Sequence, residues 1–430
     1  MMFGRSSRAE GETPPPTSPS LLARTVKEIR ENFPTWKKGK SLSFPRAETV
    51  RVCGESPQIL DENFSLFIFL VPFAAGVLSY KLCQRLMARS KNFGVDYHKK
   101  DAKHLPESIG LSSGVSFVLC IFLLSGSFQA HKESLLIFSN TIILNILLGY
   151  VDDILDLTWS CKMVFPVVAT LPLLFSYSGS TCICIPFYGV LNLGWAFYVC
   201  LVALSVYFTN AINILSGING VECGQTLVIS GMMVVDRLLF FSDKGLLSIL
   251  LCASLFFSTF SLFLWNKYPA KCFVGDTFCY FAGSALLCIG LFGGFVKTLF
   301  LFFSLQLLNF LMSLPQIAKI IPCPRHRMPA SDFTGAALLK PSIVEVSKKH
   351  VQSSYMCRLV ISLFTKCRLI SCTENKESIC LSNFTVLNAI LVWTGPISEP
   401  ALFNVYMALQ CAVCLCVILA KFAITALSVC

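Results

Sequence analysis

The stretch NAINILSGINGVECG, residues 210–224, directly follows the apolar run WAFYVCLVALSVYFT, residues 195–209. With its flanks, this run is long enough to cross a bilayer, which takes about 20 apolar residues. The stretch then places amides and glycines at the membrane edge, namely Asn210, Asn213, Asn219, Gly217, Gly220 and Gly224. Uncharged amides and bare backbone at a helix end suit a metal or nucleotide site, but small residues also let helices pack closely. This stretch alone leaves both interpretations open.

The composition is typical of a membrane protein. The chain has 430 residues, of which 54% are hydrophobic and 14% are charged, and its mean hydropathy is +0.67. The five His and 21 Cys are dispersed, so we expect no His-rich metal site and interpret the cysteines as small hydrophobic residues. The net charge of +11 lies mostly in loops. It predicts membrane topology and affinity for anionic ligands, and no binding of nucleic acid.

The apolar segments predict an all-α integral membrane protein with about ten transmembrane helices. The expected spans are residues 62–82, 112–128, 138–151, 164–178, 195–210, 223–242, 246–265, 278–293, 296–315 and 402–424. We divide the chain into a disordered polar tail (1–60), a polytopic membrane core (61–320) that we expect to hold the functional site, a cytosolic segment (321–401) with an Arg-His-Arg motif and a last transmembrane helix (402–430). The start of the tail is polar, so we expect no cleavable signal peptide.

Basic residues distinguish two kinds of loop. Seven Lys or Arg lie from Lys81 to Lys103, and the segment 316–401 carries many more, whereas the intervening loops have almost none. The positive-inside rule therefore places the basic loops in the cytosol. The same topology brings five polar connections to one face: 83–111, 152–163, 211–222, 266–277 and 316–401. We expect one composite site there, whereas a transporter typically places ionisable groups in mid-span.

Three acids and a lysine follow the third expected span in LLGYVDDILDLTWSCK, residues 147–162. Asp152 and Asp153 are adjacent, Asp156 lies about one helical turn further, and Lys162 follows. Paired carboxylates at a membrane edge can bind Mg²⁺, orient a phosphate through the metal or accept a proton. The alternative for the acids is a charged helix end, and for Lys162 it is an anchor on the cytosolic side.

Three further loop segments carry groups that suit an anionic ligand. In FVGDT, residues 273–277, Asp276 can bind a metal and Phe273 can stack on a base, although Asp276 can also cap the following helix. In CPRHR, residues 323–327, two arginines flank a histidine and can hold phosphate, or form a basic patch on anionic lipid. GVDYHK, residues 94–99, and Glu107 lie in the first basic loop. Glu107 can accept from a ribose hydroxyl, or simply be solvated.

Taken together, these segments resemble the polyprenyl-phosphate hexose-1-phosphate transferases. The resemblance covers roughly residues 62–330 and rests on GVDYHK, LPES, VDDILDLTW, TNAINILSGINGVECGQ, WNKYPAKCFVGDTFCYFAG, LNFLMSLPQ and IPCPRHR. CPRHR together with FVGDTFCYFAG is similar to the eukaryotic branch of the family. The chain departs from the family at Asp156, where Asn is usual, and at Ser160 and Cys161, where basic residues are usual.

The resemblance implies a role for each matching residue. Asn213 and Asp276 would hold Mg²⁺, and Asp152 and Asp153 would support placement of the phosphates. The nucleotide sugar would contact Val95, Asp96, Tyr97, Glu107, Asp156, Trp159, Gly217, Asn219, Phe273, Arg325, His326 and Arg327. Dolichyl phosphate would contact Lys162 and the helix wall Val206, Tyr207, Phe208, Thr209, Asn210, Ala211, Ile212, Asn213 and Ile214.

The resemblance also implies a reaction and a place. The enzyme would move GlcNAc-1-phosphate from UDP-GlcNAc to dolichyl phosphate in the endoplasmic reticulum membrane, release UMP and face the cytosol with its active site. This is the first step of the lipid-linked pathway for N-glycosylation. Two alternatives stay open: a sister enzyme for another UDP-sugar or polyprenyl phosphate, and a non-catalytic transporter or scaffold. The sequence also leaves a homodimer open.

Overall fold

The computed structural model describes residues 62–99, 103–177, 180–185, 189–240, 245–324, 326–332 and 338–427. Everything below concerns the unit Leu60–Cys430. The expected disordered tail, residues 1–60, lies outside the described residues.

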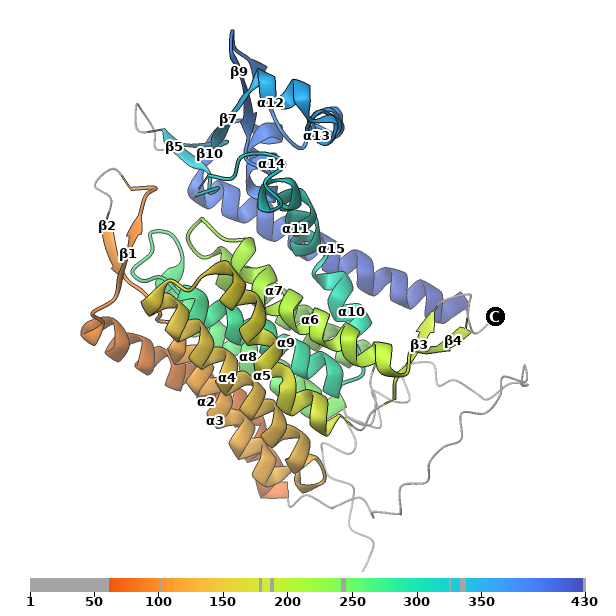
Figure 1. Cartoon of the computed structure of the whole chain (residues 1–430). Helices are drawn as coiled ribbons and strands as arrows, with labels where there is room; N and C mark the ends of the chain where they lie inside the picture. The colour runs from red at the N-terminus through yellow and green to blue at the C-terminus, as the bar shows by residue number, and fades with distance from the viewer. Residues whose placement is uncertain are drawn as a thin grey trace, which may run out of the picture. The chain divides into compact units, whose positions relative to one another are not determined.

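Helices form most of the described unit (Figure 1). The helices at the expected spans are α2 (Glu62–Arg89), α3 (Leu111–Ser127), α4 (Lys132–Leu155), α5 (Trp159–Ser176), α6 (Trp195–Ile214), α7 (Val221–Leu239), α8 (Gly245–Asn266), α9 (Gly275–Phe292), α10 (Val296–Phe302), α11 (Ser304–Ile317) and α15 (Glu399–Leu427). Each expected span therefore coincides with helix. Shorter helices follow in η1 (Gln129–His131), α12 (Lys348–Ser353), α13 (Tyr355–Lys366) and α14 (Val386–Thr394).

Length and hydropathy support a multi-pass membrane protein. Among the described residues, five segments are long and apolar enough to cross a bilayer: Gln129–Leu155, Trp195–Ile214, Gly245–Asn266, Gly275–Phe292 and Glu399–Ala426. A sixth crossing is possible where α10 and α11 meet at a bend of 60°. The ninth expected span, 296–315, is thus broken in two, and the expected number of about ten crossings stays a prediction.

The structure adds short strands to the expected helical fold. In the described part of the chain, two sheets have two strands each: β1 (Phe93–Asp96) pairs with β2 (Lys103–Pro106), and β3 (Cys182–Ile185) pairs with β4 (Gly189–Asn192). Two further sheets there have three strands each. In one, β6 (Leu338–Lys340) lies between β5 (Ala330–Asp332) and β10 (Ile397–Ser398), and in the other, β9 (Ser378–Ser382) lies between β7 (Ile343–Ser347) and β8 (Cys372–Glu374). All these pairs are antiparallel. The strands lie in loops because a hairpin satisfies backbone polar groups locally where the apolar helices end.

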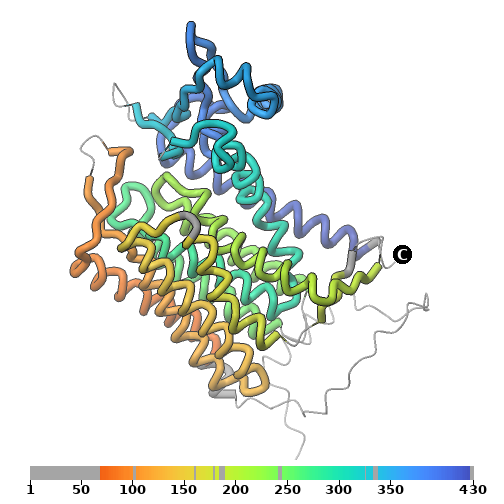
Figure 2. The backbone as a smooth tube through the Cα atoms, viewed as in Figure 1, coloured from red at the N-terminus to blue at the C-terminus, as the bar shows by residue number. Residues whose placement is uncertain are grey.

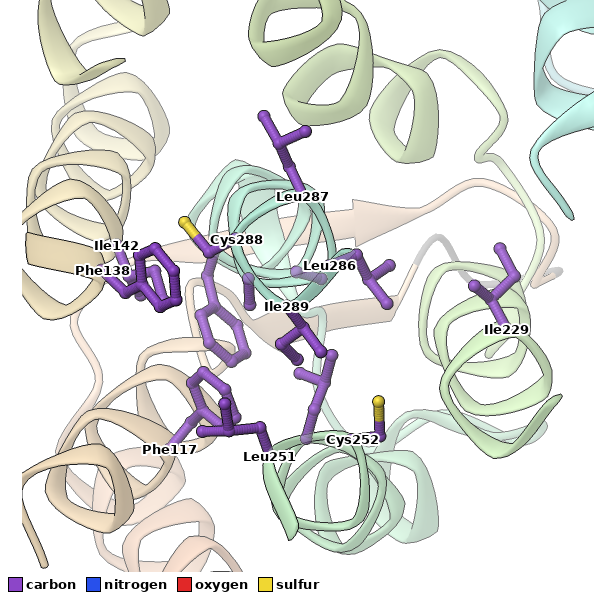
Figure 3. Packing of buried hydrophobic residues seen from close by; sticks show 14 of the residues in the cluster. Phe117, Phe138, Ile142, Ile229, Leu251, Cys252, Leu286, Leu287, Cys288 and Ile289 are labelled. Atoms are coloured by element: carbon purple, nitrogen blue, oxygen red, sulfur yellow. The ribbon is translucent and has the colours of Figure 1, made fainter. Parts of the chain in front are cut away.

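Helix α9 is the centre of the bundle. Of its apolar window 83% is buried, and it packs most extensively against α4 and α6. Figure 3 shows Leu286 and Ile289 of α9 among side chains of the surrounding helices, including Phe117 and Leu251. Figure 2 follows the same helices as a continuous tube. A helix that is apolar all round can be covered by protein or by lipid, and α9 is covered mostly by protein.

Close approach of α9 to its neighbours depends on glycine. A Cβ on Gly283 would lie 2.1 Å from the carbonyl oxygen of Phe208 on α6, and a Cβ on Gly149 of α4 would lie 2.6 Å from that of Asp276. Small residues let helix backbones approach in a bilayer, where van der Waals packing holds helices together.

Buried amides fasten α15 to the bundle. The Gln306 side chain of α11 donates to Gln225 Oε1 of α7 at 2.8 Å and to Gln410 Oε1 of α15 at 3.0 Å. The Gln410 amide donates in turn to the carbonyl of Phe302 at 2.8 Å. These bonds satisfy polar groups that lipid could not satisfy.

Replacing Gly283 by Ala should destabilise the fold, because the new methyl group meets backbone that cannot move without displacing α6. We expect a loss of roughly 1–3 kcal/mol, measured as a lower thermal unfolding temperature in detergent. Gly126→Ala is the matched control, since nothing lies within 4 Å of the added atom. Equal unfolding temperatures for the two variants would contradict this packing argument.

Candidate active site

The first feature of the site is a carboxylate that caps α9 from another helix. Asp153, near the end of α4, accepts from the backbone N–H groups of Asp276 at 2.6 Å and of Thr277 at 3.2 Å. It also accepts from the Thr277 hydroxyl at 2.6 Å. Gly275 makes room, because its φ is +74° and a Cβ there would lie 2.2 Å from the Asp153 carboxylate. An anion at a helix N-terminus is favoured by the unpaired amides and the helix dipole.

A cluster of charges lies beside this cap. Lys162 Nζ lies 3.0 Å from Asp152 Oδ1 and 3.5 Å from Asp276 Oδ2. The Asn213 amide of α6 donates to Asp276 Oδ1 at 2.8 Å. Three helices and the α9 cap therefore bring together residues that are far apart in the chain. The sequence placed all four of these side chains in one site, and the structure confirms their proximity.

Asp152 is held by a different set of three donors. Its buried carboxylate accepts from the Tyr280 hydroxyl at 2.9 Å and from the Leu157 backbone N–H at 3.1 Å, in addition to its ion pair with Lys162. A carboxylate with three donors is well suited to hold a lysine in place.

A polar cavity of about 320 Å³ opens from the charge cluster into the loops. We call it the loop cavity. Its lining contains the predicted residues Val95, Asp96, Tyr97, Glu107, Asn213, Gly217, Asn219, Phe273 and Asp276. Segments 106–110 and 273–274 form its wall together, through bonds such as that from the Phe273 N–H to the Pro106 carbonyl at 2.8 Å.

Two glycines shape this cavity. A Cβ on Gly94 would lie 2.9 Å from the ring of Phe273, so the absence of a side chain lets that ring pack on β1. Gly217 has φ +111°, and a Cβ there would lie 2.8 Å from Met328. A positive φ of this size favours glycine over other residues.

Glu399 is part of the site that the sequence did not predict. This buried carboxylate begins α15 and accepts from the Asn219 backbone N–H at 2.7 Å and from Lys99 Nζ at 3.1 Å. Lys99 also pairs with Asp96 at 3.4 Å, and Asp96 accepts from the Asn219 amide at 3.2 Å. The only sequence signal was an acid at the start of an apolar helix. The closed set of bonds fixes the β1 loop against the Gly217–Gly220 turn.

A second, larger hollow adjoins the charge cluster on the other side. This lateral groove has a volume of about 730 Å³. Its lining includes Lys162, Val206, Tyr207, Asn210, Ala211, Asn213, Ile214, Phe310, Leu314, His326 and Arg327. It shares Asn213, Ser216, Gly217 and Met328 with the loop cavity. The two hollows therefore meet beside Lys162 and Asp276.

The predicted lipid wall, 206–214, is only partly on the groove. Phe208, Thr209 and Ile212 are buried in the bundle and do not line it. A continuous stretch of helix cannot present all its side chains to one side, since successive residues turn by about 100°. The prediction was too broad for these three residues. Asn210 lines the groove and also donates to the Val206 carbonyl at 2.9 Å.

His326 and Arg327 of the Arg-His-Arg motif line the lateral groove. His326 lies against the ring of Tyr97, with ring centroids 5.4 Å apart. Arg327 has a buried guanidinium nitrogen, Nη1, without a hydrogen-bond partner among the described residues, and burial lowers its pKa. A buried cation with an unused donor suits an anionic ligand. Arg325 lies outside the described residues.

One predicted contact, Asp156, lies apart from the hollows, and the side chain of another, Trp159, is outside the described residues. Asp156 is exposed, with φ +45° at the C-terminal end of α4, and lines neither the loop cavity nor the lateral groove. Trp159 begins α5, but its side chain lies outside the described part of the chain.

The donor set agrees with a magnesium ion that is held partly by substrate. Among the described residues, no three His, Cys, Asp or Glu side chains form a metal-binding group. Asp276 and Asn213 are hard oxygen donors that lie together where the two hollows meet. Mg²⁺ commonly takes one or two protein ligands and completes its shell with phosphate and water. These two residues fit such an ion.

A polar cavity joined to an apolar groove through a charge cluster is the arrangement of a membrane-embedded transferase with one polar and one lipid substrate. Residues 135–294 match the family Glycosyl transferase family 4. Similarity to individual proteins extends over most of the chain.

The chain is 32% identical over 385 residues to the UDP-N-acetylglucosamine–dolichyl-phosphate N-acetylglucosaminephosphotransferase of Saccharomyces cerevisiae. The matched region covers 78% of this chain and 85% of the yeast protein. It is 33% identical over 390 residues to the protein of the same name from Dictyostelium discoideum, covering 80% of this chain and 86% of that one. The Schizosaccharomyces pombe protein of that name is 36% identical over 285 residues, covering 61% and 64%. The chain therefore belongs to glycosyl transferase family 4.

Glu107 should give the fold a measurable pH dependence. Burial, followed by the charge of Asp153, raises the pKa of Glu107 to about 7 from the ordinary 4.5. The folded state thus binds an extra proton between these values, and stability falls as the pH rises through this window. Glu107→Gln should remove this loss, so the unfolding temperature of the variant relative to wild type should rise between about pH 5 and about pH 8.

Glu377→Gln, at an exposed position, serves as the control for the Glu107 measurement. A constant difference between Glu107→Gln and wild type across the same pH range would show that Glu107 titrates normally.

Proposed function

We propose that this protein transfers GlcNAc-1-phosphate from UDP-GlcNAc to dolichyl phosphate and releases UMP. This proposal rests on the observation that the loop cavity and the lateral groove meet beside Lys162 and Asp276. One hollow suits a polar nucleotide sugar and the other suits a lipid chain. The names of the yeast and Dictyostelium relatives support the same two substrates.

The loop cavity would hold the nucleotide sugar. Uracil would lie between Gly217 and Phe273, and Asn219 would face its polar edge. Glu107 and the Val95–Tyr97 backbone would contact the uridine. His326 and Arg327 would hold the pyrophosphate and the sugar, which agrees with the unused guanidinium donor of Arg327.

The lateral groove would hold the lipid. Val206, Tyr207, Asn210 and Ile214 of α6 offer a mostly apolar wall, with Lys162 at the end that meets the loop cavity. A phosphate beside Lys162 would place its isoprenoid chain along this wall. The helix face defined by these residues refines the broader stretch that the sequence suggested.

Asp276 and Asn213 would hold Mg²⁺. When bound, this ion would neutralise phosphate charge and stabilise the charge that develops on the transferred group. The amide of Asn213 would turn its oxygen toward the ion, giving up its present bond to Asp276.

In the reaction, an oxygen of dolichyl phosphate forms a bond to the β-phosphorus of UDP-GlcNAc. The bond from this phosphorus to the bridging oxygen breaks, and that oxygen leaves on UMP with the bonding electrons. Two anions must approach each other, so the charges of Lys162 and Arg327 offset their repulsion. A phosphate monoester is largely ionised near neutral pH, and the attacking oxygen therefore needs no strong base.

The paired aspartates are better suited to positioning than to proton transfer. Asp153 accepts from two backbone amides and a hydroxyl, and thereby fixes the start of α9 and Asp276. Asp152 fixes Lys162. In our proposal these two residues set the geometry of the groups that contact substrate.

The proposal places the protein in the endoplasmic reticulum membrane with its active site in the cytosol. The basic segments 83–111 and 316–401 both contribute to the hollows, the first through Gly94–His98 and Glu107 and the second through His326–Met328. The positive-inside rule puts such segments on the cytosolic side.

Replacing Asp276 by Ala should remove a metal ligand and a partner of Lys162. Turnover should fall by about 10²–10³-fold, measured with purified protein, UDP-GlcNAc, dolichyl phosphate and Mg²⁺. The exposed Glu377→Gln variant should retain activity. Normal turnover by Asp276→Ala, in protein shown to be inserted and folded, would refute the assignment.

Ala203→Phe should narrow the lateral groove, since Ala203 lines it. We expect KM for dolichyl phosphate to rise by about tenfold while KM for UDP-GlcNAc stays the same, because a misfit in an apolar site costs about this factor. Val199→Phe lies one turn away on the same helix, on an exposed face, and controls for the added bulk. A rise in KM for the nucleotide sugar alone would place the lipid elsewhere.

A further inference from the structure

Helix α13 carries two separate apolar faces. Its inner face, including Cys357 and Ile361, is buried in the cytosolic segment. Its outer face consists of Tyr355, Met356, Leu359 and Leu363, which are 68%, 51%, 47% and 55% exposed. Tyr355, Leu359 and Leu363 are spaced four apart and therefore form one continuous stripe. A contiguous exposed apolar stripe on a helix marks a contact surface.

Packing connects α13 to helices that are long and apolar enough to enter the bilayer. Phe364 of α13 packs against a cluster that contains Leu402 and Tyr406 of α15 and Met312 of α11. Helices α15 and α11, which contribute to this cluster, are apolar segments that can cross a membrane, α11 together with α10. Residues Leu402 and Tyr406 lie within the first eight residues of α15. Through this cluster, α13 is joined to the part of these helices that would enter the bilayer.

Trp393 is independent evidence that this part of the chain lies near the membrane surface. Trp393 is 54% exposed, and its Nε1 donates to the carbonyl of Arg368 at 2.6 Å, just beyond the end of α13. It lies six residues before Glu399, where α15 begins. Exposed Trp and Tyr side chains are typical of the interface between lipid and water.

The charge around α13 identifies the surface that it contacts. Residues 348–373 contain five Lys or Arg (Lys348, Lys349, Arg358, Lys366 and Arg368) and no Asp or Glu. Of these, Lys348 pairs with Glu374 at 3.3 Å, and Arg358 donates through Nη1 to the carbonyls of Val351 and Gln352. Arg358 and Lys366 are exposed and flank the outer face. An apolar stripe bordered by basic residues is the pattern of a helix that lies in a membrane surface with anionic lipid.

We propose that α13 lies in the headgroup region of the bilayer that holds this protein. Its outer face enters the boundary with the acyl chains, and Arg358 and Lys366 contact anionic headgroups. The contact also supports the wall of the lateral groove, because Asn388 and Ser342 of the same segment donate to the Arg327 carbonyl at 2.9 and 3.3 Å. The lipid contact itself does not depend on the transferase function.

The test uses the full chain in nanodiscs of phosphatidylcholine and phosphatidylserine. A photoreactive phenylalanine replaces Leu359 on the outer face, or Thr365 on the polar face as the matched control. After irradiation, mass spectrometry should detect phospholipid adducts several-fold more often at position 359 than at position 365. Equal adduct yields would overturn the proposal, and so would a covalent dimer formed through position 359, which would show that a second copy covers this face.

A second variant tests the charge. Arg358→Gln combined with Lys366→Gln should lower the share of phosphatidylserine among adducts at position 359 by up to about fivefold for each charge removed. Glu377→Gln, outside the basic stretch, should leave that share unchanged. An unchanged phosphatidylserine share in the double variant would overturn the assigned contact with anionic headgroups.

Discussion

The contact between the Asp153 carboxylate and the first amides of α9 is the constraint on which the site depends. It joins the end of one apolar helix to the start of another, where neither end has intrahelical partners for all its polar groups. The glycines at 149 and 275 let the two backbones approach closely enough for this contact. Asp276 is the second residue of α9, so the cap fixes its position directly.

Charge balance explains the arrangement of the other side chains around Asp276. Lys162 lies between Asp152 and Asp276, while Asn213 and Asp276 hold each other at the meeting point of the two hollows. A site that joins two anionic substrates needs positive charge, and in a largely apolar protein that charge must itself be held by acids. The acids around Lys162 thus hold this charge where two anions would meet.

The sequence predicted most of the helices and much of the site. The spans could be predicted because a helix that crosses lipid requires a long apolar segment. The loop residues were accessible because topology gathers them on one face, and the resemblance then separated binding groups from solvated ones. The break in the ninth expected span was not predicted, because residues 296–315 form a continuous apolar run in the sequence, whereas the two helices there meet at a bend of 60°.

Other features depended on three-dimensional geometry. Glu399 and Lys99 are 300 positions apart, and no local pattern joins them. Phe208, Thr209 and Ile212 are buried because α6 turns this face toward the bundle. The sequence could not show which face this is, because α6 is apolar on all sides and has no clear hydrophobic periodicity. The different partners of Asp152 and Asp153 also appear only when α5 and α9 are placed beside α4.

The central claim is that the bond from the β-phosphorus to UMP breaks where the two hollows meet. UDP-GlcNAc with a radioactive phosphorus label in its β-phosphate tests this claim directly. We predict that purified protein with dolichyl phosphate and Mg²⁺ moves the label into a chloroform-soluble product, in equal amount to the UMP released. Label that stays with the nucleotide as UDP while the sugar reaches the lipid would contradict the account.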